Sequence, residues 1–126
     1  MTRDNEQIVV DFCNAWEKVD LDLVMSFFSD DIIYHNMPMA PAEGTEAVRE
    51  MINGFLSQTA ASNWQIKSIA TEGDAVLTER VDRFEMKDGK IIELPVMGTF
   101  ELREGKIARW RDYFDLQTWV RQAQGG

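Results

Sequence analysis

The stretch Ala75–Met86, AVLTERVDRFEM, decides the fold that this sequence predicts. Its apolar and polar residues alternate, and successive side chains of a β-strand point to opposite faces. Arg80 and Asp82 share one face, whose apolar members are Val76, Phe84 and Met86. The opposite face has its own apolar residues, Leu77 and Val81, and we choose the Arg80 face as inward because the neighbouring strands show the same arrangement. A buried charge is costly unless it is paired, so an inward Arg80 and Asp82 need a charge partner and suggest a functional role.

The apolar spacing upstream of this strand predicts helices. Apolar residues recur at helical intervals over Asp4–Val19, and a shorter helix is expected over about Leu21–Phe28. Asp30–Met37 is expected to be extended, and Thr45 is expected to cap a third helix that reaches Leu56. The first half of the chain is therefore mainly helical.

The second half of the chain predicts strands joined by short turns. Besides Ala75–Met86, the expected strands are Trp64–Thr71, Ile91–Leu102 and Ile107–Phe114, followed by a short helix over Leu116–Gln124. Aspartate-glycine and glutamate-glycine pairs between alternating runs are typical of hairpins. Helices followed by a meander predict an α+β fold, with a curved mixed or antiparallel sheet and the N-terminal helices packed on it. Such a cone has a natural pocket between sheet and helices.

Composition excludes several classes of function. The 126 residues are most simply one domain, 1–126, and a net charge of −9 argues against nucleic-acid and anionic-membrane surfaces, which need clustered Lys and Arg. Cys13 is the only cysteine and His35 the only histidine, so cysteine clusters and the usual histidine zinc sites are not expected. We find no signal peptide and no apolar run of about 20 residues, so a cytoplasmic location is expected by default.

Five polar residues stand where the pattern otherwise puts apolar ones: Tyr34, Asn36, Arg80, Asp82 and Asp112. Arginine stays charged and can hydrogen-bond two carboxylates through its planar fork. Two carboxylates brought close together tend to retain one proton, which provides an acid and a base from the same residue type. A tyrosine and an asparagine can hold a water.

The alternation in two further segments bears on which way Tyr34, Asn36 and Asp112 point. Asp112 shares a face of the last strand with Ala108, Trp110 and Phe114, and Ile107 falls on the opposite face. The phase of residues 32–37 is ambiguous because both of their faces are half apolar. An Arg-x-Asp on one strand is also common as a structural ion pair or in a subunit interface. Spacing alone therefore leaves both a structural and a catalytic interpretation open.

These residues resemble a known family, the limonene-1,2-epoxide hydrolases, within the wider group of cone-shaped folds similar to nuclear transport factor 2 (NTF2) and ketosteroid isomerase. The matching stretches are Tyr34–Pro38, Thr78–Asp82, Gly105–Ile107 and Trp110–Asp115. The resemblance extends from about Phe28 to Leu116. All five polar residues of that family's site fall on matching positions. The wider group shares its shape without sharing its chemistry.

The resemblance implies a role for each residue. Asp112 would be the base that takes a proton from water, and Tyr34 and Asn36 would position that water. Asp82 would be the acid that protonates the epoxide oxygen, and Arg80 would bridge the two aspartates. Water would attack in one step without a covalent enzyme ester. The family also implies a homodimer that needs neither cofactor nor metal.

The resemblance further implies an apolar pocket for a small apolar epoxide. Residues expected to shape it are Met39, Leu94, Val96, Phe100 and Phe114. A cyclic or terpene-like epoxide would give a vicinal diol, and a monoterpene epoxide, another cyclic epoxide and a lipid-derived epoxide all stay open.

Two other functions fit the same residues. The first is an isomerase or cyclase of the ketosteroid-isomerase type acting on a carbonyl substrate, with Tyr34 and a protonated Asp82 as hydrogen-bond donors to the oxyanion. The Arg80 bridge argues against it, because it occupies the donor. The second is a non-catalytic dimeric module that binds a small ligand, which is favoured if Asp82 and Asp112 lie far apart.

Overall fold

A computed structural model describes residues 4–124, so both ends of the expected 1–126 domain lie outside the described residues. The helices are α1 (Asn5–Ala15), the 3₁₀ turn η1 (Trp16–Lys18), α2 (Leu21–Met25), α3 (Thr45–Leu56) and α4 (Leu116–Ala123). The strands are β1 (Phe28–Asn36), β2 (Ala42–Glu43), β3 (Thr59–Glu72), β4 (Ala75–Met86), β5 (Ile91–Arg103) and β6 (Lys106–Tyr113).

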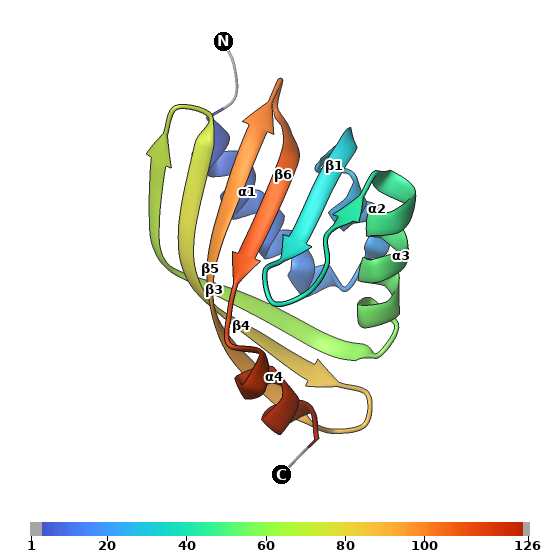
Figure 1. The fold of residues 1–126 in the computed structure, drawn as a ribbon. Coiled ribbons are helices and arrows are strands. Elements are labelled where there is room, and N and C mark those ends of the chain that lie inside the picture. The colour runs from blue at the N-terminus through green and yellow to red at the C-terminus, as the bar shows by residue number, and fades with distance from the viewer. Residues whose placement is uncertain (1–3, 125–126) are drawn as a thin grey trace.

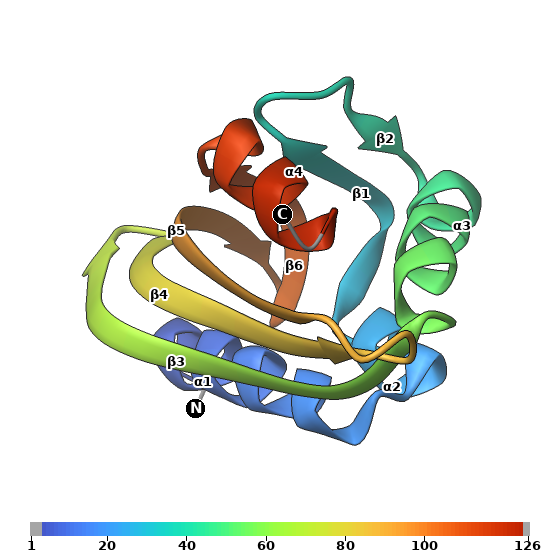
Figure 2. The same ribbon diagram turned by 90° about the horizontal axis from the view of Figure 1, so that it is seen from below.

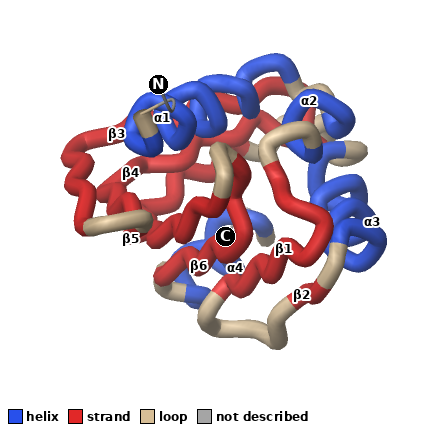
Figure 3. Tube along the Cα trace, turned by 90° about the horizontal axis from the view of Figure 1, so that it is seen from above, coloured by secondary structure: helices blue, strands red, loops and turns tan. Residues whose placement is uncertain are grey.

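The strands form one six-stranded sheet in the order β2-β1-β6-β5-β4-β3. Every neighbouring pair is antiparallel except β1 and β6, which run parallel, so the sheet is mixed. The sheet is strongly curved, with α1 along it and α4 beyond the end of β6 (Figure 1). The helix α3 stands beside β1 and β2 (Figure 2). Seen from above, α1, α2 and α3 follow one another around the rim (Figure 3). The result is the expected cone-shaped α+β fold.

The helices form where they were predicted, and all of them except α3 end sooner than predicted. Asp4 caps α1 by accepting from the backbone N–H of Glu6, and the last predicted turn is the 3₁₀ turn η1, after which Val19 is left-handed with φ of 51°. The prediction that Thr45 caps α3 is wrong. Gly44 is the N-cap, and Thr45 is already helical. The cap has φ of +88°, a conformation that glycine adopts without steric cost.

The strand prediction for Ala75–Met86 is confirmed with both bounds, and its Arg80 face is the buried one. The prediction of which β6 residues face inward was wrong at one end of the strand. Ile107 is fully buried instead of facing outward, because the register shifts where Glu101 and Leu102 pair with Arg109 and Ile107. This shift leaves Ala108 as an extra residue, and such a bulge reverses the alternation beyond it.

The core centres on Phe12 of α1, whose ring contacts aromatic rings of several strands. Among them are Phe28 of β1, Trp64 of β3, Phe100 of β5 and Trp110 of β6, with ring centroids 5.0–6.2 Å away. These rings hold α1 against the inner face of the sheet. Among residues 4–124, no helix is long and apolar enough to cross a membrane.

Candidate active site

Arg80 of β4 joins the two aspartates into one buried cluster. Its Nη2 donates to Asp82 Oδ2 at 2.8 Å and to Asp112 Oδ2 at 2.9 Å, so one nitrogen lies between both carboxylates. Asp82 lies two residues along the same strand, whereas Asp112 comes from β6, on the far side of β5. The three side chains are almost completely buried. Strand β6 therefore supplies a carboxylate that is 32 positions from Arg80 in the sequence.

The hydrogen-bonding capacity of Arg80 is completely used. Its Nε donates to Asp82 Oδ1 at 2.9 Å, and its Nη1 donates to Asp112 Oδ1 and to Thr78 Oγ1, both at 3.2 Å. With the two bonds from Nη2, these contacts account for the five N–H groups of a guanidinium. The Thr78 hydroxyl donates in turn to the carbonyl of Gly98 at 3.3 Å. The cluster thus holds the guanidinium in one orientation.

Gly98 makes the room in which these groups meet. It pairs with Thr78 on one side and with Asp112 on the other. A Cβ at this position would lie 2.3 Å from Arg80 Nη1 and 2.6 Å from Asp112 Oδ1. Sequence reasoning did not single out Gly98 and named other residues of this strand as pocket residues: Leu94, Val96 and Phe100. A glycine inside a strand is a signal of close approach, which would have identified it.

Burial and charge act against each other in this cluster. Burial works to lower the pKa of Arg80, but Asp112 and Asp82 outweigh it and hold that pKa well above its usual value. Burial raises the pKa of Asp82 to about 6, although Arg80 works to lower it. Arg80 therefore stays charged, and Asp82 holds its proton to a higher pH than an exposed aspartate does.

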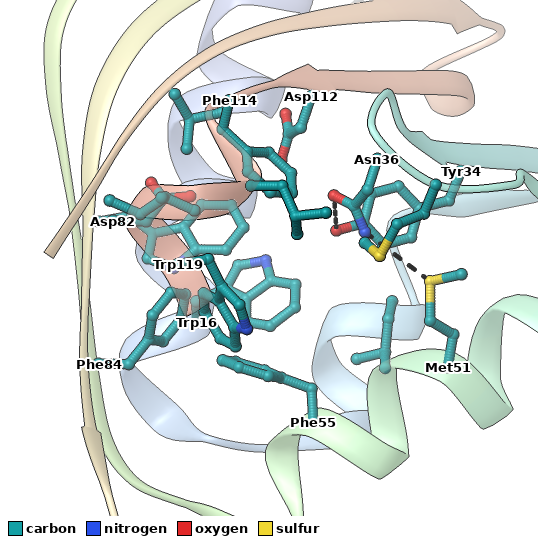
Figure 4. A pocket seen from close by; sticks show the side chains of 16 residues that line it. Trp16, Tyr34, Asn36, Met51, Phe55, Asp82, Phe84, Asp112, Phe114 and Trp119 are labelled. Carbon is teal, nitrogen blue, oxygen red and sulfur yellow. Dashed lines mark hydrogen bonds between the residues drawn. The ribbon is translucent and has the colours of Figure 1, made fainter. Parts of the chain in front are cut away.

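Tyr34 and Asn36 lie beside Asp112 because β1 pairs in parallel with β6. In this register Tyr34 is opposite Trp110, and Asn36 is opposite Asp112. The Tyr34 hydroxyl donates to Asn36 Oδ1 at 3.0 Å, as Figure 4 shows. Burial raises the pKa of Tyr34, so its hydroxyl keeps its proton. Of the two faces that the sequence left open, Tyr34 is on the buried one.

An apolar cavity of about 250 Å³ opens onto this cluster. Its polar lining residues are Tyr34, Asn36, Asp82 and Asp112. These four are among the five predicted residues, and the rest of the wall is aliphatic or aromatic. A ligand here would meet hydrogen-bonding groups at one end only.

Four of the five residues expected to shape a pocket line this cavity: Met39, Leu94, Val96 and Phe114. Phe100 does not. It is fully buried against Phe12 and Trp110, because it lies beyond Gly98 on β5, where α1 covers the sheet. Sequence reasoning missed a larger set, which it treated as core or did not consider: Trp16, Met51, Ile52, Phe55, Trp64, Phe84, Leu116 and Trp119. Residues that fill a core and residues that line a cavity produce the same apolar stripe on a helix, so the sequence pattern does not distinguish them.

The other candidate groups lie apart from this chemistry. His35 lies near the end of β1, partly exposed, with its Nε2 2.7 Å from the carbonyl of Met39. Cys13 is buried, and burial raises its pKa to about 12, so it stays a neutral thiol. Within residues 4–124, no group of three or more His, Cys, Asp or Glu side chains is arranged to hold a metal ion.

Comparisons with known proteins agree on a fold and on a family. A model of the limonene-1,2-epoxide hydrolase catalytic domain matches residues 3–124. Epoxide hydrolase EphG of Mycobacterium tuberculosis is 31% identical over 105 residues, which are 83% of this chain and 69% of that protein. The solved structure of an M. tuberculosis LEH-like epoxide hydrolase has a TM-score of 0.81 at 28% identity and covers 96% of this chain and 92% of its own.

A SnoaL-like polyketide cyclase structure from Shewanella denitrificans has a TM-score of 0.83 at 16% identity, covers 97% of this chain and 98% of its own, and shows likeness of fold alone. The cone-shaped sheet and its helices place this chain in the NTF2-like and SnoaL-like fold class. Within that class the chain belongs to the limonene-1,2-epoxide hydrolase family, because the family model spans nearly all of it.

Proposed function

We propose that this protein hydrolyses a small apolar epoxide to a vicinal diol without a cofactor. The observation that carries the proposal is the single guanidinium nitrogen between two buried carboxylates, at the polar end of an apolar cavity. Membership in the family and the 31% identity to an epoxide hydrolase support it.

In the proposed reaction, Asn36, Tyr34 and Asp112 hold the attacking water. The Tyr34 hydroxyl donates to Asn36 Oδ1, which leaves the tyrosine oxygen to accept from water and the asparagine NH₂ to donate to it. Asp112 accepts the second water hydrogen. One water lone pair then remains for the epoxide carbon, so the polar groups leave the water one direction in which to react.

Bond making and proton transfer balance across the cavity. The water oxygen bonds to one epoxide carbon while its proton passes to Asp112. The carbon–oxygen bond of the ring breaks, and Asp82 gives its proton to the departing oxygen. The raised pKa of Asp82, about 6, suits it to the role of acid. General acid and base catalysis contribute about 10²–10⁴-fold each. A solvent proton exchange then returns Asp82 and Asp112 to their starting states.

The cavity supports a compact cyclic or terpene-like substrate. Its volume of about 250 Å³ corresponds to about eight waters at about 30 Å³ each. Beyond the polar end, the wall offers large aromatic surfaces, among them Phe55, Phe84 and Trp119. An apolar ring system with the epoxide at one end matches this division.

The two other functions have less support. A carbonyl isomerase or cyclase has less support because the family model and the 31% identical relative are both epoxide hydrolases. A purely ligand-binding module was favoured by distant aspartates, and here both carboxylates contact one nitrogen. The family also supports a homodimer, for which the exposed Leu77, Met97 and Tyr113 offer an apolar surface on the outer face of the sheet.

The test is chiral gas chromatography of products from a panel of cyclic, terpene and lipid-derived epoxides. Each epoxide is incubated with the parent protein and with Asp112→Asn, and Asp88→Asn, in an exposed turn, is the matched control. We expect diol from the parent and from Asp88→Asn, and a loss of about 10²–10⁴-fold in Asp112→Asn. A folded parent that yields no diol from any epoxide would refute the proposal.

A further inference from the structure

Trp110 contacts both the proposed base and the proposed water-holding tyrosine. Its side chain is fully buried, and its indole N–H donates to Asp112 Oδ1 at 2.8 Å. Its ring stacks on Tyr34 with centroids 3.8 Å apart and an angle of 7° between the planes. One side chain thus contacts two of the groups that the proposed hydrolysis needs.

The hydrogen bonds make the two oxygens of Asp112 unequal. A carboxylate oxygen has about two lone-pair sites. Oδ1 accepts from Trp110 Nε1 and from Arg80 Nη1, so both of its sites are occupied. Oδ2 accepts from Arg80 Nη2, and among the described residues no second donor to it is recorded. Oδ2 therefore keeps a lone pair for the water.

We propose that Trp110 is a positioning residue for the hydrolysis. Its N–H occupies Oδ1, which makes Oδ2 the oxygen of Asp112 that takes the water proton, and its ring holds Tyr34 against the same water. The inference rests on the proposed function. It specifies which oxygen of Asp112 acts as the base, which the Arg80 bridge alone does not decide.

Other buried indoles show that this hydrogen bond is not a simple result of burial. The N–H groups of Trp16 and Trp64 are buried too, and neither has a hydrogen-bond partner. The fold leaves those two donors unpaired and directs the third at a carboxylate. A hydrogen bond to a charged acceptor is stronger than one between neutral groups, so this contact also holds the carboxylate plane.

The kinetic test compares Trp110→Phe with Trp16→Phe. Both changes remove an indole N–H and keep an aromatic ring, but only the first removes a bond to Asp112. We expect Trp110→Phe to lower kcat by about 10- to 100-fold, with a much smaller change in KM. Trp16 lines the cavity, so Trp16→Phe should act mainly on KM.

The pH profile separates positioning from packing. A hydrogen bond to a carboxylate favours its charged form, so its loss should move the acid limb of kcat/KM to higher pH in Trp110→Phe alone. The ionisable groups around Asp112 are Arg80 and Asp82 from β4, Tyr34 from β1 and Cys13 from α1, and both variants keep all of them.

An NMR measurement tests the contact without activity. The chain has four tryptophans, and the indole ¹⁵N–¹H signal of Trp110 is the one absent from Trp110→Phe. If that variant does not fold, Trp16→Phe, Trp64→Phe and Trp119→Phe assign the other three signals and leave that of Trp110 by elimination. We expect this signal to move in Asp112→Asn more than those of Trp16 and Trp64.

A Trp110 signal that stays in place in Asp112→Asn would overturn the proposal, whatever the activity. An unchanged kcat and acid limb in a folded Trp110→Phe would overturn the positioning role even if the contact exists. A parent inactive on every epoxide would refute the hydrolysis, and the role with it, while the NMR result still decides the contact.

Discussion

The two ends of the cavity are built in different ways. At the polar end, Arg80, Asp82 and Asp112 are only 1–3% exposed and stand on the central strands β4 and β6. At the apolar end, Phe55 of α3 and Trp119 of α4 are only partly buried, and α4 has no fully buried residue. The proposed chemistry thus stands on strands, where positions are best maintained, and part of the proposed substrate-shaping wall stands on helices that are only partly buried.

The attachment of α4 shows the contrast most directly. The Gln122 side chain makes two bonds to the backbone of Glu93 on β5, donating at 2.9 Å and accepting at 2.6 Å. Asp115 caps the start of the helix by accepting from the N–H of Thr118. Both contacts are exposed, where water competes for hydrogen bonds. The apolar end can therefore change without disturbing the polar end.

Arg80→Ala should have the largest effect on stability. It leaves two buried carboxylates without their bridge, and breaking a buried ion pair costs about 3–5 kcal/mol. Urea unfolding measures the change. The control is Arg103→Ala, which breaks a fully exposed pair with Asp31 and should cost far less, because water screens exposed ion pairs. Equal losses in the two variants would contradict the buried cluster.

Gly98→Ala should come next. Its Cβ would lie within 2.6 Å of two members of the cluster, and overpacking costs about 1–3 kcal/mol. We also expect most of the diol-forming activity to disappear, because Arg80 or Asp112 must move. The matched control is Gly54→Ala in α3, where a Cβ meets no atom within 4 Å and the helix should gain about 0.5–1 kcal/mol. A fully active Gly98→Ala would show that the close approach is unnecessary.

The third prediction concerns the pH dependence of stability at the polar end. Burial raises the pKa of Asp82 from 3.8 to about 6, so the folded protein binds this proton more tightly than the unfolded chain. The free energy of unfolding should therefore fall as pH rises from about 4 through about 6. Asp82→Asn carries no such proton, so its dependence over this range should be flatter. Urea unfolding of both proteins at several pH values checks this, and identical slopes would contradict it.

Gln122→Ala should have the smallest effect, and only at the apolar end. Loss of its two exposed bonds should loosen α4 and raise KM by about 3- to 10-fold, with little change in kcat. Gln117→Ala is the control on the same helix, at an exposed position away from β5. Steady-state kinetics on the best epoxide measures both variants. A fall in kcat as large as that of KM would mean that the two ends are coupled.

The sequence by itself determined the local features. The alternation in Ala75–Met86 predicted both the strand and its inward Arg80 and Asp82, because the side-chain period of a strand is a property of consecutive residues. The helix that begins at Leu116 and the α+β order of elements are local in the same sense. The five polar residues were also identified from the sequence as candidate site residues, although their closeness in space was only an expectation at that level.

The tertiary structure alone decided what depends on neighbours across the sheet. The parallel pairing of β1 with β6 places Asn36 opposite Asp112, and Gly98 gives Arg80 the space to reach across β5. The bulge that buries Ile107 and the position of Phe100 behind the cavity have the same origin. Strand pairing joins residues far apart in the chain, and no periodicity within one segment records which strand lies beside it or in which register.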